Sequence, residues 1–162
     1  MKSWMLRMIP IVCLALIVAG FGFVLPGNAD TGLPALTVTV PGQPIWNYTG
    51  LTVTAGQVLE LRSVGYVCTY EVGGVFSTSG PEGQVDGLGC GDYEGVPPPC
   101  GLDHAPYGML LGKIAGANKS VVFGIGDADT LKAPISGKLY LGVNDNLDGY
   151  YDNYGFFRVT FK

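Results

Sequence analysis

The chain has 162 residues, which suits one domain, and carries nine basic against 13 acidic residues, a net charge of −4 at pH 7. This balance excludes a nucleic-acid partner, because phosphate backbones are bound by clustered Lys and Arg side chains and the sequence contains no such cluster. Acidic residues gathered around a cation fit the balance better.

The first residues are predicted to form a secretory signal rather than part of the fold. Lys2 and Arg7 make a short basic start, residues 8–25 are almost wholly apolar, and residues 27–29 are the small residues that a signal peptidase needs. We expect cleavage after Ala29, which gives a secreted, periplasmic or cell-surface protein with seven basic against 13 acidic residues. The alternative is an uncleaved anchor, and membrane contact is expected through this segment alone.

The remaining chain is rich in Gly and in β-branched and aromatic residues, and no window shows helical periodicity. Residues 30–44 are predicted to be a lead-in to a domain at 45–162, although residues 36–40 alternate like an edge strand. Further short strands are predicted at 51–54, 58–64, 108–114, 120–125, 137–143 and 155–161. Short strands separated by turn residues predict an all-β protein, a single antiparallel β-sandwich or barrel.

Residues 73–106 are dense in Gly and Pro and are predicted to be irregular. A segment of that length without regular structure is usually functional or cross-linked. Cys90 and Cys100 bracket three consecutive prolines within it, and in an exported protein we expect them to form a disulfide and to leave Cys68 as a free thiol. The sequence leaves the other pairings open. A zinc site made of the same two cysteines and His104 lacks a fourth ligand.

The segment between the last two predicted strands is rich in side-chain oxygen atoms. Residues 144–153 contain three aspartates and three asparagines. Calcium takes six to eight oxygen ligands from carboxylates, amides and backbone carbonyls, so this segment is a candidate metal site in which Asp145 and Asp152 would balance the charge. A polar hairpin turn explains the same composition, because Asn, Asp and Gly also favour turns.

Several segments, taken in order, resemble the LecA-type (PA-IL-like) galactophilic lectins of bacteria. They are Trp46–Gly50, Ala55–Gln57, Gly65–Tyr66, Gly80–Gly83, Leu110–Ile114, Gly137–Asp145 and Asp152–Gly155. The resemblance covers residues 45–162 and implies a jelly-roll β-sandwich, similar to galactose-binding-like domains, that binds a glycan or glycoconjugate with the help of Ca2+. Family members can be tetrameric, so a homo-oligomer is a further expectation.

The resemblance also implies which residues bind the metal and the sugar. In that family, calcium is held by the aspartate after the penultimate strand, a carbonyl four residues later, two consecutive residues at the end of the loop, and one more carbonyl. The corresponding residues in this chain are Asp145, Gly149, Asp152, Asn153 and Thr69, or Tyr70 if the match slips by one position. The residues expected to contact the sugar, whose two vicinal hydroxyls bind the metal directly, are Asp145, Asn146 and Asp152. Tyr150 is a further candidate, because aromatic rings stack on sugars, and packing at the end of a sheet is the alternative role for it.

One departure limits what the resemblance implies. The galactophilic members carry a His-Pro pair and a Gln after the Gly-Pro-x-Gly turn, whereas residues 84–87 of this chain read Gln-Val-Asp-Gly, so galactose specificity is not carried over. The alternative function is a structural surface module, in which calcium or a plain turn merely holds the loop. An enzyme is not expected, because the chain has no GxSxG nucleophile motif and three acids within eight residues more often share a cation than act as glycosidase carboxylates.

Overall fold

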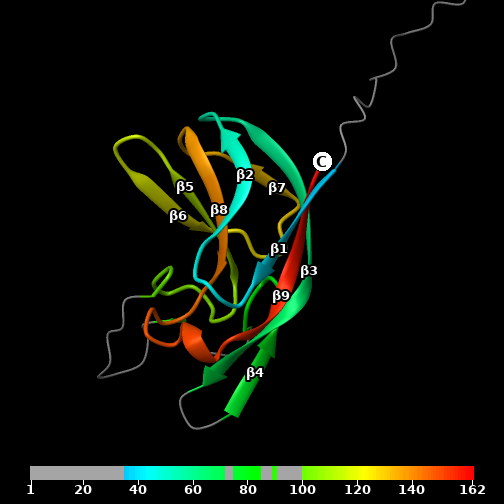
Figure 1. Ribbon diagram of the computed structural model, residues 1–162, viewed down its shortest axis with the longest axis vertical. Helices are drawn as coiled ribbons and strands as arrows, with labels where there is room; N and C mark the ends of the chain where they lie inside the picture. Colours follow the sequence, from blue (N-terminus) through cyan, green and yellow to red (C-terminus); the bar gives the residue numbers. More distant parts are fainter. Residues whose placement is uncertain (1–34, 72–74, 85–88, 91–99) are drawn as a thin grey trace, which may run out of the picture. The chain divides into compact units, whose positions relative to one another are not determined.

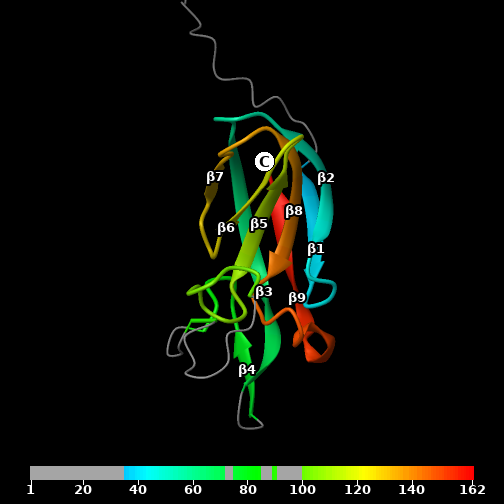
Figure 2. The ribbon, with the colours of Figure 1, turned by 90° about the vertical axis from the view of Figure 1, so that its left-hand side faces the viewer.

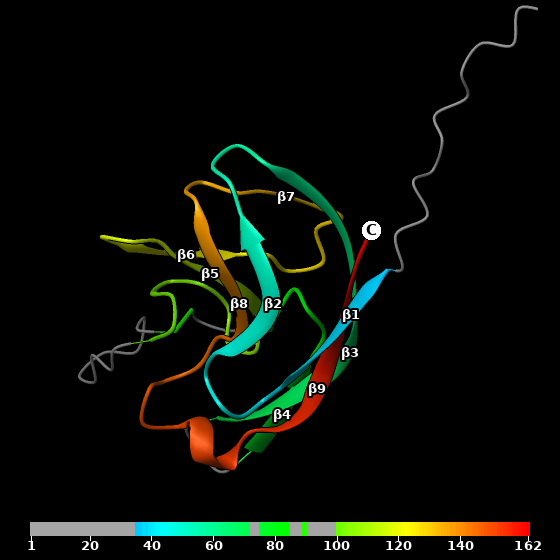
Figure 3. The same cartoon turned by 45° about the horizontal axis from the view of Figure 1, so that its top comes forward.

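Two antiparallel β-sheets pack face to face, which confirms the predicted all-β sandwich. The computed structural model describes residues 35–71, 75–84, 89–90 and 100–162, all of which belong to one compact unit, Leu33–Lys162. One sheet has the strand order β1-β9-β3-β4, with β7 also paired to β3, and the other has the order β2-β8-β5-β6. Figures 1 and 3 show the sheets as separate layers. The predicted signal, residues 1–29, lies outside the described residues.

The strands follow most of the predicted ranges. Their bounds are β1 Leu36–Pro41, β2 Asn47–Val53, β3 Val58–Glu71, β4 Val75–Ser79, β5 Leu110–Ala115, β6 Ser120–Gly124, β7 Thr130–Lys132, β8 Gly137–Val143 and β9 Tyr154–Phe161. One turn of 3-10 helix, η1 (Tyr150–Asp152), lies between β8 and β9. No helix in the described part of the chain is long and apolar enough to cross a membrane.

Four strands differ from the prediction, and the first of them, β2, begins at Asn47 rather than at Leu51. β3 continues to Glu71 rather than ending at Val64, and β4 lies inside the stretch that was predicted to be irregular. β4 pairs with the end of β3, from Val67↔Ser79 to Glu71↔Val75, so a β-hairpin replaces the start of the expected loop. β7 had no prediction and pairs with the start of β3. β4 and β7 are both held in place by pairing with β3. The sequences of these two short strands do not predict that pairing.

The lead-in segment contributes a strand to the sandwich. β1 pairs antiparallel with β9 at the edge of its sheet, from Leu36↔Phe161 to Pro41↔Phe156. Its alternation predicted an edge strand, and Val40 reaches the core with no exposed surface. The sandwich therefore begins at Leu36.

The core lies between the two sheets and comes from alternate residues of the strands. In β3, Leu61 is buried while Glu60 and Arg62 are exposed, as expected for side chains that alternate along a strand. The inward-facing rows of β9 and β8 are Phe157, Val159 and Phe161, and Leu139, Leu141 and Val143. Burying each such side chain stabilises the fold by about 1.5–3 kcal/mol. Figure 2 shows β5 and β8, which are paired, running side by side along the sandwich.

Candidate functional site

Three polar residues continue the inward-facing rows of three strands at one end of the sandwich. Because side chains alternate along a strand, Asp145 takes the next inward position after Val143 of β8, and Thr69 the next after Val67 of β3. Asn153 immediately precedes β9 and lies in its inward row. The exposed fractions are 3% for Asp145, 0% for Thr69 and 5% for Asn153. Polar groups therefore lie between the two sheets where the apolar rows end.

The connection from β8 to β9 brings the other predicted ligands to the same place (Figure 1). Gly149 precedes η1 and Asp152 is its last residue. The Asp152 N–H donates to the Gly149 carbonyl at 3.3 Å, which leaves the second lone pair of that oxygen for another partner. A Cβ atom on Gly149 would lie 3.5 Å from Asp145 Oδ1, so this glycine lies beside the Asp145 carboxylate.

Thr69 lies next to this group at the end of the β3–β9 ladder. The last pair of the ladder is Cys68↔Tyr154, so Thr69 and Asn153 are the next residues on their strands, and β3 contacts η1. Successive residues of a strand direct their backbone groups to opposite edges. One of the two alternatives, Thr69 or Tyr70, therefore directs its carbonyl toward the side of Asn153.

Burial governs the electrostatics of Asp145. Loss of solvent, with a smaller contribution from the charge of Asp152, raises the pKa of the Asp145 carboxyl group to about 6. The Asn146 N–H, which donates to Asp145 Oδ1 at 2.6 Å, and the Asn153 side chain favour the ionised form and lower the pKa in part. At neutral pH the group is an ionised but poorly solvated carboxylate, a state that a cation stabilises.

Two side-chain oxygens at this end of the sandwich, Asp152 Oδ1 and Asn153 Oδ1, are buried without a hydrogen-bond partner, and so is the amide nitrogen of Asn153. Leaving a buried acceptor unpaired costs about 1–3 kcal/mol, so such atoms usually serve an ion, a water or a function. Within the described ranges, no three His, Cys, Asp or Glu side chains cluster as a metal site. The candidate donor set is instead two carboxylates with amide and carbonyl oxygens, which fits a hard cation such as calcium.

The raised pKa of Asp145 makes the stability of the calcium-free protein depend on pH. The pKa of this carboxyl group is near 3.8 in the unfolded chain and about 6 in the folded one, so between these values the folded state binds more protons. The free energy of unfolding should therefore fall as the pH rises from about 4 to about 6, by up to about 3 kcal/mol. Urea unfolding in a chelator measures this, with Asp145→Asn as the reference that has no group to ionise. A constant difference between the two proteins across this pH range would contradict the raised pKa.

Asn144 has a role that the sequence did not reveal. It belongs to the oxygen-rich segment, but its side chain is fully buried and holds a neighbouring loop. Its Oδ1 accepts from the Leu102 N–H at 2.8 Å, and its Nδ2 donates to the carbonyls of Leu102, Ala105 and Pro106 at 3.1, 2.9 and 3.1 Å. Asn144 thus positions the start of the site, and its side chain is engaged with the 102–106 loop.

The predicted disulfide between Cys90 and Cys100 is confirmed, and Cys68 is a free, buried thiol. The bond removes both thiolates that the zinc alternative needs. His104 is exposed in the same loop, where its N–H donates to the Cys90 carbonyl at 2.9 Å.

The disulfide contacts the first residues of the candidate site. Cys100 forms a β-bridge with Asn146, and the Gly101 N–H donates to the Asp145 carbonyl at 3.1 Å. Asn146 Oδ1 lies 3.3 Å from Cys90 Sγ and accepts from the Tyr107 hydroxyl at 3.4 Å. Of the Asn146 side chain, only the amide nitrogen is left to contact a ligand.

Removing the disulfide should weaken both the fold and the site. The double variant Cys90→Ser/Cys100→Ser is expected to lose about 2–3 kcal/mol of stability, because the unfolded chain is no longer cross-linked. Calcium affinity should fall severalfold, because the bridge to Asn146 is no longer held. Thermal melting and calcium titration calorimetry measure the two effects. Cys68→Ser is the matched control, and an equal loss of calcium affinity in that variant would argue against a specific role for the disulfide.

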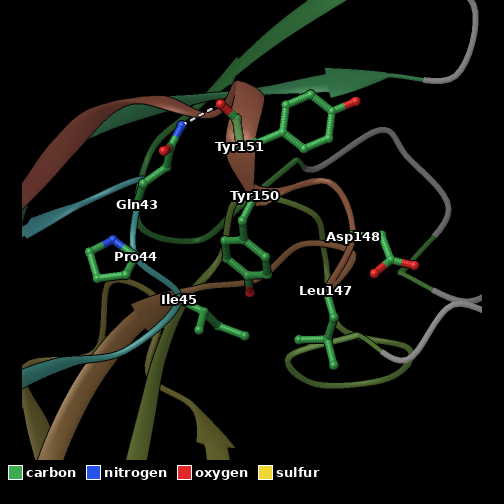
Figure 4. A pocket seen from close by; sticks show the side chains of 7 residues that line it. All are labelled: Gln43, Pro44, Ile45, Leu147, Asp148, Tyr150 and Tyr151. Atoms are coloured by element: carbon green, nitrogen blue, oxygen red, sulfur yellow. Dashed lines mark hydrogen bonds between the residues drawn. The ribbon is translucent and has the colours of Figure 1, made fainter.

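Two tyrosines of η1 differ in exposure. Tyr150 is 8% exposed and its hydroxyl donates to the Val143 carbonyl; burial raises the pKa of this hydroxyl. Only the ring of Tyr150 is left for a sugar contact. Tyr151 is 77% exposed. Both line an open pocket of about 350 Å³ between residues 43–45 and the 147–151 segment (Figure 4).

Residues 84–87, where the sugar-selecting wall of the galactophilic lectins is expected, lie mostly outside the described residues. Gln84 is described, and its Nε2 donates to Thr69 Oγ1 at 3.1 Å while its N–H donates to the Tyr107 carbonyl at 2.9 Å. This segment therefore starts in direct contact with a predicted ligand residue.

No family model and no curated protein match the sequence. Among solved structures, the chain is similar to the EclA N-terminal domain, a PllA-like lectin, with a TM-score of 0.51 and 19% sequence identity over 78% of this chain and 93% of that one. At this identity the similarity concerns the fold, and the LecA-type resemblance in particular stays a prediction. The chain has the fold of a PllA-like lectin domain.

Proposed function

We propose that this protein is an exported, non-catalytic lectin that binds a glycan in a calcium-dependent manner at the 145–153 loop. The observation that carries the proposal is the group of poorly solvated oxygens at one end of the sandwich. The buried carboxylate of Asp145 lies beside Gly149, close to unpaired oxygens of Asp152 and Asn153. The fold shared with a PllA-like lectin domain supports the same function.

Each part of the loop has a role in this proposal. The residues that would hold calcium are Asp145, Asp152 and Asn153 through side chains, and Gly149 and Thr69 or Tyr70 through carbonyls. Calcium bound there would neutralise the two carboxylates and offer coordination positions to two vicinal sugar hydroxyls. Asp145 and Asp152 would also accept hydrogen bonds from those hydroxyls, which selects ligands with the matching hydroxyl geometry.

The surrounding structure would hold these groups in place before the ligand binds. The side chain of Asn144 and the Gly101 N–H hold the chain on both sides of the Asp145 peptide group. Such preorganisation reduces the ordering cost of binding. Single lectin sites of this kind bind weakly, so useful avidity would come from a homo-oligomer or clustered ligands.

A glycan array probed with and without a chelator tests the proposal. Binding to a defined set of glycans in millimolar calcium, lost in excess chelator, is the expected result. The opposing result is that no glycan binds in calcium although calcium still raises the melting temperature; the loop would then be a structural calcium site and the protein not a lectin.

A further inference from the structure

We propose that the pocket between residues 43–45 and the 147–151 segment is a subsite for the second, uncharged ring of a glycan. This inference rests on the proposed function, because the first ring of the same glycan would be held at the calcium loop. The pocket volume of about 350 Å³ lies within the range of small-molecule sites, about 300–1,000 Å³.

The pocket is continuous with the calcium loop along the chain. Two of its lining residues, Leu147 and Asp148, lie between the proposed ligands Asp145 and Gly149. The other two from this loop, Tyr150 and Tyr151, follow Gly149 directly. The pocket and the proposed calcium ligands therefore share one loop.

The opposite wall is held against the loop by hydrogen bonds. Gln43 Nε2 donates to the carbonyls of Tyr151 and Asn153 at 2.6 and 2.9 Å, and the first of these bonds is drawn in Figure 4. A Cβ atom on Gly42 would lie 3.0 Å from Asn153 Cβ, so the two segments approach closely. The walls of the pocket are thus in place before a ligand binds, which lowers the cost of binding.

The chemistry of the walls fits a sugar ring. Figure 4 places the Tyr150 ring between Pro44 and Ile45 on one side and Leu147 on the other. Together with the ring of Tyr151, these apolar surfaces suit the C–H face of a pyranose, which packs well on aromatic rings.

The polar groups of the pocket are acceptors. Gln43 donates through its Nε2 to the carbonyls of Tyr151 and Asn153, so its Oε1 remains to accept a hydroxyl, as does the exposed carboxylate of Asp148. A carboxylate accepts from neutral sugar hydroxyls and repels anionic groups, so the second ring should carry no uronate or sulfate.

Titration calorimetry in calcium tests the subsite. Methyl glycosides of galactose, mannose, fucose and N-acetylglucosamine identify the first ring, and disaccharides that carry this ring at the non-reducing end measure the gain from the second. The wild type should bind the best neutral disaccharide about tenfold more tightly than the methyl glycoside.

Tyr151→Ala should reduce this ratio to about twofold or less and leave the methyl glycoside affinity unchanged. Tyr66→Ala, another exposed tyrosine, should keep the full ratio.

The outcomes separate the two proposals. If no glycoside binds in calcium, the proposed function is wrong and the subsite with it. If methyl glycosides bind but the gain is absent in the wild type, or survives in Tyr151→Ala, the subsite alone is wrong. A loss of methyl glycoside affinity in Tyr151→Ala also overturns it, because Tyr151 would then act through the calcium loop.

Asp148→Asn tests the expected preference of the pocket for an uncharged second ring. Replacing the second ring by a uronic acid should weaken binding to the wild type at least about fivefold, and Asp148→Asn should remove most of this difference. Equal discrimination in Asp148→Asn would show that Asp148 does not select the uncharged ring.

Discussion

Calcium should raise the melting temperature of the wild-type protein by about 10 °C at about a hundred times its dissociation constant, and Asp145→Asn should abolish the increase. The substitution keeps the shape of the side chain and removes a charge that burial leaves poorly solvated. In a chelator at neutral pH, the same variant should melt at or above the wild-type temperature, because an ionised group has left a buried position. Scanning calorimetry with calcium and with chelator measures both effects.

Loss of the calcium response, together with a melting temperature in chelator at or above that of the wild type, is expected only when the substituted residue is a calcium ligand. A purely structural aspartate would lower the melting temperature in both conditions when substituted. Asp127→Asn is the matched control, since this aspartate is exposed in a turn far along the chain from the candidate site, and it should keep the full calcium response. If Asp145→Asn also keeps it, the metal binds elsewhere or not at all.

Asn144→Ala should be the most destabilising single change at this end of the molecule. It would remove four hydrogen bonds and leave the Leu102 N–H and the carbonyls of Leu102, Ala105 and Pro106 without their partner. Because an unpaired buried polar group costs about 1–3 kcal/mol, we expect a loss of about 3–5 kcal/mol in the free energy of unfolding. Urea unfolding in a chelator measures this loss without the contribution of calcium.

Asn118→Ala is the matched control for that experiment. Asn118 is exposed in the turn between β5 and β6, and its substitution should change stability by less than about 0.5 kcal/mol. A loss of under about 1 kcal/mol in Asn144→Ala would mean that the loop at residues 102–106 is not held by this side chain. Calcium affinity in Asn144→Ala should fall as well, because Asn144 fixes the residue before Asp145.

The sequence predicted best those features that depend on local pattern. Alternation along residues 137–143 gave β8 with its bounds, and the same alternation places Asp145 at the next inward position. The disulfide followed from two cysteines that flank a proline-rich stretch in a chain with a predicted secretory signal. These inferences needed no knowledge of which strand lies beside which.

Features that depend on distant pairing were missed. In the sequence Asn144 is one oxygen among several, because its partners lie about forty positions earlier in the chain. The bond of Gln43 to the Tyr151 carbonyl joins residues 108 positions apart, so the pocket between them has no local signal. Alternation also does not separate the buried Tyr150 from the exposed Tyr151, because η1 turns the chain between them.

The inward rows that end in polar residues belong to both layers of the sandwich. Asp145 follows a strand of one sheet, while Thr69 and Asn153 belong to strands of the other. A cation bound by all three would therefore add a further link between the two layers at this end of the sandwich. Such a cross-link acts mainly on the rate of unfolding, since opening the sandwich first requires releasing the ion. If the protein is exported as we propose, calcium would then set its lifetime among extracellular proteases as well as its ligand.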